Sequence, residues 1–463
     1  MALTSFSYES IIPADASDVF SYFGRNLSIL RLTPPWETLK LQNITRDMES
    51  GSTLDLRIRL GCLETNWQVH RVGYAKNRTL INRQTRGPFR IWKHSQSLRS
   101  LGDATSTLRE LVQFSLPFGK LSNNRLGIHL TRKRLERLFN YRHTNAQIDM
   151  RHCTQVKDFP KTKVAITGGN GLIGSELAVF LKAQGHDVTI LSRSGKSRIW
   201  GVPAEQWDPR AKAADWKKLE GIDGWIHLAG ENLASGRWTS KKMKSLRSSR
   251  VEGTRFLAEG FKQMSNPPKV FIGASGIGYY GDGADAELTE TRSKGSGFLA
   301  DLCEDWEGAS TEMEAMGMRR VILRIGMVLT PKGGALAKLL PVYKAGLGGR
   351  QGGGTQYWSW IAMDDLLRVF HTALLNPHFR GVYNAVSPTP LQNREFSSAL
   401  ARKVSRPGVC SAPRGVLTLL LGRMAKETLL ASQRVIPQRL TESGFRFDFP
   451  TLDLTLSHLL GRH

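Results

Sequence analysis

An eight-residue stretch, TGGNGLIG from Thr167 to Gly174, constrains the fold of this chain more than any other. The apolar run KVAIT precedes it, and the helix-like segment SELAVFLKAQG follows it. Glycines between a strand and a helix are typical of the first turn of a doubly wound α/β sheet, where they permit a tight turn and let the helix pack against the strand. A plain tight turn is the alternative, but the two flanking segments favour the sheet.

The spacing Gly169-x-Gly171-x-x-Gly174 also indicates a ligand. Glycines at these positions let backbone N–H groups approach a pyrophosphate, and the N-terminus of the following helix favours the phosphate charge. We therefore predict a dinucleotide site. The residues expected to bind the cofactor in this loop are Gly168, Gly169, Gly171, Leu172, Ile173 and Gly174.

The end of the next apolar run indicates which dinucleotide binds. An NAD site usually has a carboxylate there, which binds the ribose hydroxyls. This chain has Ser192, 18 residues after Gly174, followed by Arg193. A serine can hydrogen-bond a 2′-phosphate and an arginine can pair with it, so we predict NADP as the cofactor. The alternative is that Arg193 is an ordinary surface cation.

Apolar runs alternate with helix-like segments from Lys163 onward. The expected strands are VAIT, DVTILS, GWIHLAG, KVFIGAS and RRVILRIG, with helices ending near Gln184 and Phe261 and another around Leu302. Runs buried on both faces and connected by helices indicate a parallel, doubly wound Rossmann sheet. We expect this NADP-binding domain to span residues 162–411.

Residues 1–150 follow a different pattern. The short alternating segments SFSYESI, STLDLRIRL, NWQVHRVGY, IWKHSQSLRSL and TLRELVQFSL indicate antiparallel strands with one covered face. An early helix begins at Pro13-Ala14-Asp15-Ala16, and a basic helix from Leu126 to about Asn145 closes the segment. Residues 151–161 show neither period, so we expect a linker there.

Composition limits the remaining classes of protein. A chain of 463 residues with 40% hydrophobic and 23% charged side chains is expected to fold into several globular domains. Its net charge of +25 is spread over both halves, with 24 basic and 12 acidic residues through Lys157 and 41 and 28 after it. Solvated surface accounts for this excess, so no specific nucleic-acid partner is expected; salt-dependent duplex binding is the alternative.

Four scattered cysteines, Cys62, Cys153, Cys303 and Cys410, form no CxxC pair or cluster with histidines. We therefore expect no metal site and a reducing, cytoplasmic setting. The first residues lack the regions of a secretory signal, and no apolar run is long enough for a transmembrane segment. The sequence does not indicate an oligomeric state.

The order strand, helix, many strands and long basic helix in residues 1–150 resembles the START and polyketide-cyclase-like (SRPBCC) superfamily, an α+β helix-grip fold. The string GPFRIW, Gly87 to Trp92, adds support. In that superfamily the curved sheet and the long helix enclose a cavity, so the resemblance implies a small apolar ligand. A filled core is the alternative.

The strings TGGNGLIG, LSRS, HLAGENL (His227 to Leu233) and SGIGYYGD resemble the extended short-chain dehydrogenase/reductase superfamily. Residues 163–463 are similar to epimerase-family proteins of the bacterial YfcH type, through AGEN, RWT, LRIG, a glycine-rich loop and VIPQR. Residues 412–463 resemble the small C-terminal domain of that family. The resemblance implies that Leu228, Ala229 and Gly230, at the end of the fourth strand, and Arg250 contact the cofactor. Core packing and surface charge are the alternatives.

Members of the superfamily polarise a substrate oxygen with Ser or Thr and move the proton with a Tyr-x-x-x-Lys pair. Ser275 fits the first role. Where the pair is expected, the chain has Phe298 or Leu299 in place of Tyr, and Leu302 or Cys303 in place of Lys. None of these can relay a proton as the pair does, which puts ordinary catalysis in doubt.

Two other tyrosines, Tyr279 and Tyr280, lie close enough to Ser275 in sequence to substitute for the missing one. The alternative is that both pack under the turn that follows, Gly281 to Gly283.

Two further segments have an expected role. Asp364 and Asp365 match the two aspartates of a family WIHxDD motif, in which Ala362 replaces the histidine, and are expected to cap the next helix. The glycine-rich loop from Gly346 to Gly354 indicates mobility or a close backbone approach. It is either a substrate lid or a long flexible turn.

Two functional hypotheses follow. The first is an NADP-dependent oxidoreductase or epimerase with a small-molecule substrate, and with a fused domain that holds an apolar substrate or sensor ligand. The second is a catalytically inert NADP-binding regulatory or sensor protein, which the missing Tyr-x-x-x-Lys pair favours.

Overall fold

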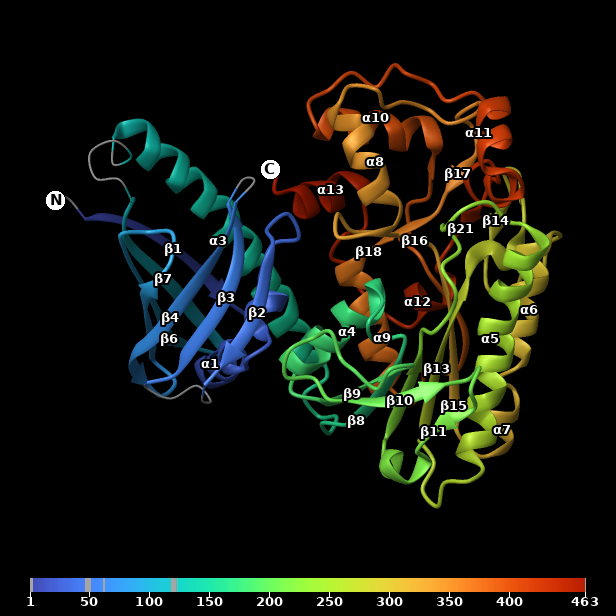
Figure 1. Ribbon diagram of the computed structural model, residues 1–463, viewed down its shortest axis with the longest axis horizontal. Coiled ribbons are helices and arrows are strands. Elements are labelled where there is room, and N and C mark those ends of the chain that lie inside the picture. Colours follow the sequence, from blue (N-terminus) through green and yellow to red (C-terminus); the bar gives the residue numbers. More distant parts are fainter. Residues whose placement is uncertain (1–2, 46–50, 61–62, 118–121, 123, 463) are drawn as a thin grey trace. The chain divides into compact units, whose positions relative to one another are not determined.

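The computed structural model describes residues 3–45, 51–60, 63–117, 122 and 124–462. The chain divides into two compact units (Figure 1). The first comprises residues 1–160 with 179–186, and the second comprises residues 161–178 with 187–463. Each unit is built on a sheet of its own.

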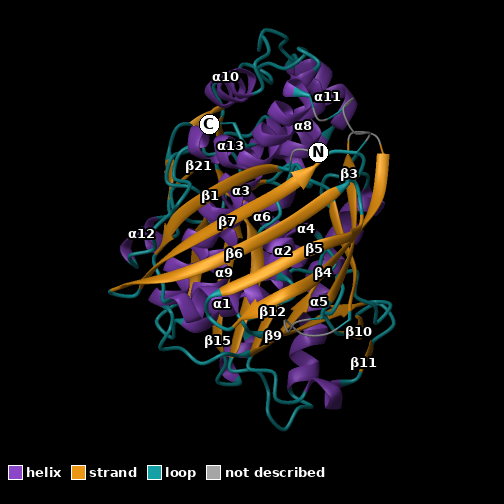
Figure 2. Cartoon of the chain, turned by 90° about the vertical axis from the view of Figure 1, so that its left-hand side faces the viewer, coloured by secondary structure: helices purple, strands orange, loops and turns teal. Residues whose placement is uncertain are grey.

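The described residues of the first unit form a seven-stranded antiparallel sheet with the order β1-β7-β6-β5-β4-β3-β2 (Figure 2). Its strands are β1 (Thr4–Ile12), β2 (Leu39–Ile44), β3 (Thr53–Leu60), β4 (Leu63–Ala75), β5 (Thr79–Arg86), β6 (Ile91–Gly102) and β7 (Thr105–Ser115). β2 and β5 were not among the strands expected from the sequence, because their polar and apolar residues alternate too irregularly to mark a buried face.

Alternation along the strands gives this sheet one buried face. In β7, Ser106, Leu108, Glu110, Val112 and Phe114 are buried, while the residues between them are more exposed. Side chains alternate between faces along a strand, so every second residue of β7 faces the core. Glu110 is a fully buried carboxylate within this otherwise largely apolar face.

The helices of this unit are α1 (Ala16–Gly24), α2 (Ser28–Arg31) and α3 (Arg125–Gln155). Leu135 and Phe139 of α3 pack with Trp92, Val112 and Phe114 of the sheet. The expected arrangement of a sheet against one long helix, the α+β helix-grip class, is confirmed.

The end of α3 corrects the sequence analysis. The helix was expected to end near Asn145 but continues to Gln155, through the first residues of the expected linker. Asp149 on this extension is fully buried and accepts hydrogen bonds from Tyr22 at 2.6 Å and from Arg31 at 2.8 Å. These tertiary contacts stabilise turns that the local sequence pattern did not indicate.

The second unit contains an eight-stranded sheet with the order β11-β10-β9-β8-β12-β13-β15-β19. Its strands are β8 (Lys163–Thr167), β9 (Asp187–Ser192), β10 (Ala204–Asp208), β11 (Ala213–Ala214), β12 (Gly224–His227), β13 (Val270–Gly276), β15 (Arg319–Ile325) and β19 (Gly381–Ala385). All pairings are parallel except that of β10 with β11. The predicted doubly wound α/β fold is therefore confirmed.

The strand order reverses between β8 and β12. In sheets of this kind the crevice beyond the carboxyl ends of the strands at such a point binds the ligand. Thr167, His227 and Gly276 end three of these strands. The expected strand GWIHLAG is shorter than predicted. It stops at His227, and Leu228 to Leu233 form a loop beyond the sheet.

The helices from residue 161 onward are α4 (Leu172–Ala183), α5 (Ser240–Phe261), α6 (Phe298–Gly308), α7 (Glu312–Ala315), α8 (Gly334–Lys344), α9 (Met363–Leu375), α10 (Asn393–Lys403), α11 (Arg414–Leu421), α12 (Gln438–Glu442) and α13 (Leu452–Leu460). Short strands pair β14 (Glu287–Leu288) with β21 (Arg434–Val435), β16 (Met327–Leu329) with β18 (Trp360–Ala362), and β17 (Tyr357–Trp358) with β20 (Leu391–Gln392). The β14–β21 pair holds the C-terminal segment next to Tyr280, which packs with Leu288 and Val435.

Candidate active site

The loop between β8 and α4 has the shape expected of a phosphate cradle. Gly168 has a φ of +74°, and a Cβ there would lie 2.8 Å from the carbonyl carbon of Leu228. A Cβ at Gly174 would lie 2.4 Å from the Gly168 oxygen. Backbone atoms cannot yield as a flexible side chain can, so both positions require glycine.

The start of α4 leaves N–H groups without helical partners. The first intrahelical bond runs from Ser175 N to Gly171 O at 2.9 Å, so the amides of Leu172 and Ile173 precede the helical ladder. Among the described residues, no side chain accepts a hydrogen bond from either amide, and Gly171 beside them is exposed. These residues fit the diphosphate of a dinucleotide, because bare amides at a helix N-terminus bind anions.

Ser192, at the end of β9, has its hydrogen bonds within its own loop. Its hydroxyl accepts from Lys196 N at 3.1 Å and donates to Lys196 O at 3.0 Å. Asn170 of the glycine loop fixes the same turn, donating to Lys196 O and accepting from Arg198 N, both at 2.8 Å. Ser192 could donate to a 2′-phosphate only by giving up its bond to Lys196 O, a cost that the sequence did not indicate.

Arg193 is exposed next to this turn. The ammonium of Lys242, 2.7 Å from Glu231, lowers the pKa of the Glu231 carboxyl, and the charges of Arg210 and Arg193 lower it further. The described edge beyond β9 and β12 is therefore rich in cations, with one carboxylate among them. An excess of positive charge of this kind would attract the additional 2′-phosphate of NADP.

Leu228 and Ala229, partly exposed, lie in the loop after β12, and Leu228 N donates to Thr167 O at 3.0 Å. The interpretation of Arg250 as a surface cation is wrong. Only 7% of Arg250 is exposed, its guanidinium donates to Leu246 O at 3.1 Å, and it lies 5.0 Å from the ring centre of Trp306. Burial lowers its pKa to about 10. The guanidinium also lies 3.0 Å from the position that a Cβ of Gly230 would take, so it lies directly beside the loop.

A buried histidine supports the strand ends. His227 Nδ1 lies 2.6 Å from Thr167 Oγ1, and its Nε2 has no hydrogen-bond partner among the described residues. Burial, aided by the charge of Arg250, lowers the pKa of His227 to about 3. The ring is therefore neutral at physiological pH.

The Ser275 side chain belongs to a buried polar network. Its hydroxyl donates to Glu307 Oε1 at 2.7 Å. Arg324 binds the same carboxylate through two nitrogens, at 2.9 Å to Oε1 and 2.8 Å to Oε2. Ser275 comes from β13, Arg324 from β15 and Glu307 from α6, so three elements converge here.

Tyr280 belongs to the same network. Its hydroxyl accepts from Arg324 Nη1 at 3.0 Å and donates to Asn384 Oδ1 at 2.7 Å. The Tyr279 ring lies under the Arg324 guanidinium, 3.3 Å from its centre. Burial raises the pKa of Tyr280. The alternative that both tyrosines only pack under the following turn is therefore wrong.

Sequence reasoning assigned no role to Glu307, Arg324 or Asn384. One signal was available, because an arginine inside the apolar strand VILRIG must find a buried anion or remain unpaired at a high cost. Glu307 is the carboxylate that fills this requirement. Its pairing with Ser275 depends on tertiary packing and has no local sequence pattern.

The residues at the positions expected for the Tyr and Lys of the usual pair also have apolar surroundings in the structure. Phe298 packs against Trp238 with ring centres 5.6 Å apart, and Leu299 and Leu302 are buried in the same cluster. The Cys303 thiol points to Gly276 O at 3.5 Å, and burial raises its pKa to about 11. None of them is a substitute proton carrier.

The glycine-rich loop is held by hydrogen bonds to the backbone of residues 410–412. Cys410 N donates to Gly348 O at 3.1 Å, Ala412 N donates to Arg350 O at 2.9 Å, and Gly352 N donates to Ala412 O at 2.9 Å. A Cβ at Gly349 would lie 2.0 Å from Cys410 O. Close backbone approach therefore accounts for the glycine at position 349.

Asp364 and Asp365 do not cap α9. The N-cap residue is Ala362, without a side-chain cap bond. Asp365 is fully buried, accepts from Asp448 N at 3.0 Å and Phe449 N at 3.1 Å, and has its pKa raised to about 6 by burial. Its role is structural, as expected. It does not cap α9, however, but joins this helix to the C-terminal segment by hydrogen bonds.

Within the part of the chain that the structure describes, no group of three or more His, Cys, Asp or Glu side chains is arranged to hold a metal ion. No described helix combines the length and the apolar character needed to span a membrane. Three cysteines in this part, Cys153, Cys303 and Cys410, are free thiols, and Cys62 lies outside it.

Two family models match the chain. Residues 164–385 match the NAD dependent epimerase/dehydratase family, and residues 412–459 match a domain of unknown function, DUF1731. The first match contains the glycine cradle, Ser275, the Glu307 carboxylate that accepts the Ser275 hydrogen bond, and the Arg324 guanidinium that binds this carboxylate.

Known proteins resemble the chain over the same region, and one solved structure resembles it over nearly its whole length. An epimerase family protein of Mycobacterium bovis, Mb2239, is 37% identical over 65% of this chain and 98% of its own length. The crystal structure of human epimerase family protein SDR39U1 with NADPH is 31% identical over 65% of this chain and 100% of that one, with a TM-score of 0.58. A nucleoside-diphosphate sugar epimerase from Corynebacterium glutamicum is 28% identical, with a TM-score of 0.78, over 98% of this chain and 90% of that one. The glycine cradle, the strand order and these relatives together show that the chain belongs to the NAD-dependent epimerase/dehydratase family.

Proposed function

We propose that this chain is an NADP-dependent oxidoreductase or epimerase that acts on a small-molecule substrate. The observation that carries the proposal is the glycine cradle at the point where the strand order reverses, with the bare amides of Leu172 and Ile173. Bound NADP would supply hydride chemistry. Exposed Arg193 and the NADPH named with the human relative support NADP over NAD.

Ser275 and Glu307 would move the proton of this reaction in place of the missing Tyr-x-x-x-Lys pair. The Ser275 proton is donated to Glu307, so the serine oxygen can accept a hydrogen bond from a substrate hydroxyl. When that hydroxyl gives its proton to Ser275, the serine proton passes to Glu307 Oε1. In the reverse direction Glu307 returns it. Arg324 holds the carboxylate in place through two hydrogen bonds.

The cofactor preference is tested by fluorescence titration of the full chain with NADPH and NADH. We expect NADPH to bind at least about tenfold more tightly, because a guanidinium can pair with the 2′-phosphate. Arg193→Gln should remove most of this preference and leave NADH binding unchanged. Arg255→Gln, which changes an exposed arginine of α5, is the control and should alter neither affinity. Equal affinities for the two cofactors in the unaltered chain would refute the proposal of NADP.

A catalytically inert NADP-binding regulatory or sensor protein is the second candidate. The engagement of the Ser275 proton with Glu307 favours it, because this hydroxyl is not free to donate to a substrate carbonyl. The two candidates are separated by incubating the NADP-loaded chain with a panel of nucleoside-diphosphate sugars and following epimers or oxidised products by NMR. Turnover of any sugar would exclude the inert protein.

The first unit is proposed to be a fused domain, of the START-like kind, that binds a small apolar ligand. Its support is a cavity of about 230 Å³ between the sheet and α3, which argues against a filled core. A reducing, cytoplasmic setting is proposed from the three free thiols. The proposed domain boundaries are 1–150, a linker at 151–161 whose first five residues form the end of α3, 162–411 and 412–463.

A further inference from the structure

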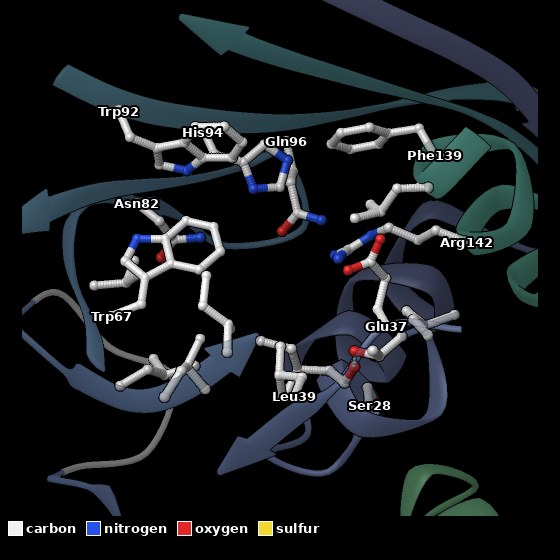
Figure 3. Close-up of a pocket in the computed structure, with 18 of the residues that line it drawn as sticks. Ser28, Glu37, Leu39, Trp67, Asn82, Trp92, His94, Gln96, Phe139 and Arg142 are labelled. Carbon is white, nitrogen blue, oxygen red and sulfur yellow. Dashed lines mark hydrogen bonds between the residues drawn. The ribbon is translucent and has the colours of Figure 1, made fainter. Parts of the chain in front are cut away.

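The cavity of the first unit has an aromatic and aliphatic wall. Trp67 of β4, Trp92 of β6 and Phe139 of α3 line it (Figure 3). Phe89, Leu56 and Val69 complete this wall. Trp67 and Trp92 lie edge to face with ring centres 5.2 Å apart, and Phe89 lies 4.6 Å from Trp92. A cavity of roughly 150 Å³ is enough for benzene, so about 230 Å³ accommodates a molecule of about ten heavy atoms.

One end of the cavity is polar. His94 and Gln96 of β6 and Arg142 of α3 line it, and each of them hydrogen-bonds Glu110 behind the wall. Each donor nitrogen lies 2.9 Å from a Glu110 oxygen. Burial alone would raise the pKa of the Glu110 carboxyl, but the charges of Arg142 and His94 hold it well below its usual range. Glu110 is therefore a fixed anion that orients three donors from two elements.

Arg142 has hydrogen-bonding capacity left over. Its Nε donates to Glu110 Oε1, while neither terminal nitrogen has a hydrogen-bond partner among the described residues. The side chain is 16% exposed and borders the cavity, toward which Figure 3 shows the guanidinium pointing. A guanidinium has five N–H donors in a planar fork that matches a carboxylate. Four of these donors remain for a ligand.

The charges around the cavity have one predominant sign. Among the described residues, four arginines line it, Arg25, Arg71, Arg134 and Arg142, against one lining carboxylate, that of Glu37. Glu37 already pairs with Arg134. Adding Glu110 behind the wall still leaves an excess of two positive charges. A neutral apolar ligand would fill the wall region but leave the Arg142 donors without an acceptor, which is costly in a half-enclosed site.

We propose that this cavity binds a small amphipathic carboxylate, with its apolar body between the aromatic side chains and its carboxylate on the terminal nitrogens of Arg142. The inference rests on the proposed role of the first unit in ligand binding and names the chemical class of its ligand. Glu110 acts as a positioning residue, because it holds the Arg142 guanidinium from behind the wall, and His94 and Gln96 in turn hydrogen-bond Glu110.

The test is isothermal titration of the full chain at pH 7.5 with octanoate and with octan-1-ol, which share an apolar body and differ in the head group. We expect octanoate to bind at least about tenfold more tightly. Equal binding of the two would overturn the carboxylate proposal and leave the apolar-ligand role standing. Binding of neither would refute that role as well.

Variants locate the site. Arg142→Gln should remove the preference for octanoate while octan-1-ol still binds, which also shows that the cavity has stayed folded. Lys133→Gln is the matched control on the same helix; because Lys133 is exposed and does not line the cavity, the preference should change less than about twofold. Val69→Phe adds bulk to the apolar lining and should abolish binding of both probes. Retained octanoate preference in Arg142→Gln would overturn the assignment to Arg142.

Discussion

At the scale of single residues, the candidate site depends on a buried arginine and its anion. Arg324 lies inside β15 and is 4% exposed, and Glu307 supplies the carboxylate that it requires. This pair explains why Ser275 can be oriented without a Tyr-x-x-x-Lys pair. Arg324 and Glu307 lie together because leaving a buried charge unpaired costs several kcal/mol.

Glu307→Gln should destabilise the chain by about 3 kcal/mol, because it leaves the Arg324 charge without an anion. The double variant Glu307→Gln with Arg324→Met should recover most of this loss, since it removes both charges. The shift of the urea midpoint measures each effect. Glu304→Gln, an exposed position of the same helix, is the control. A double variant as unstable as the single one would contradict the proposed pairing.

The lowered pKa of His227 predicts that the free energy of unfolding depends on pH. Its folded pKa of about 3 lies below the ordinary value of 6.5, so the unfolded chain binds more protons between these values. Stability therefore falls as the pH falls toward and below 6.5, by about 1.6 kcal/mol from this residue between pH 6.5 and 5. In His227→Gln this contribution should be absent. Urea midpoints of both proteins at the two pH values check it, and parallel losses would show that His227 does not contribute.

At the scale of elements, the connection from β8 to α4 is fixed by backbone contacts. The loop brings Gly174 against Gly168 so closely that no side chain fits between them, and the same packing leaves the first amides of α4 open. The glycine-rich loop near Gly349 uses the same device against Cys410 but presents no bare helix N-terminus. Glycine content alone therefore does not distinguish a binding loop from a packed one.

Gly174→Ala should weaken NADPH binding by at least about tenfold, because its Cβ would lie 2.4 Å from the Gly168 oxygen and displace the cradle. Gly415→Ala is the control, since a Cβ there meets nothing within 4 Å. Fluorescence titration measures both. Unchanged NADPH affinity in Gly174→Ala would place the cofactor elsewhere.

At the scale of the whole molecule, two compact units carry two candidate sites of different chemistry. One offers bare amides to a diphosphate, and the other encloses an apolar cavity with one guanidinium. Likeness to the Corynebacterium glutamicum structure over 98% of this chain, with a TM-score of 0.78, shows that the two folds also occur together in that protein.

Hydrogen exchange on the full chain should separate these sites. NADPH is expected to protect the segment around Gly171, and octanoate to protect β6 and the part of α3 that carries Arg142, because a ligand slows the opening of the elements it contacts. Mass spectrometry of peptides from each region provides the measurement. Protection of the glycine loop by octanoate alone would contradict separate sites.

The sequence by itself determined the class of both units and the position of the cradle. Alternation with period two marks strands with one buried face, and a glycine triplet between a strand and a helix requires a close backbone approach, so both are local properties of the chain. Tertiary structure alone decided the rest: the extension of α3 held by Asp149, the burial of Arg250, the bonds that occupy Ser192, and the meeting of Ser275 with Glu307 and Arg324. Such pairings join residues far apart in the chain, and packing selects them.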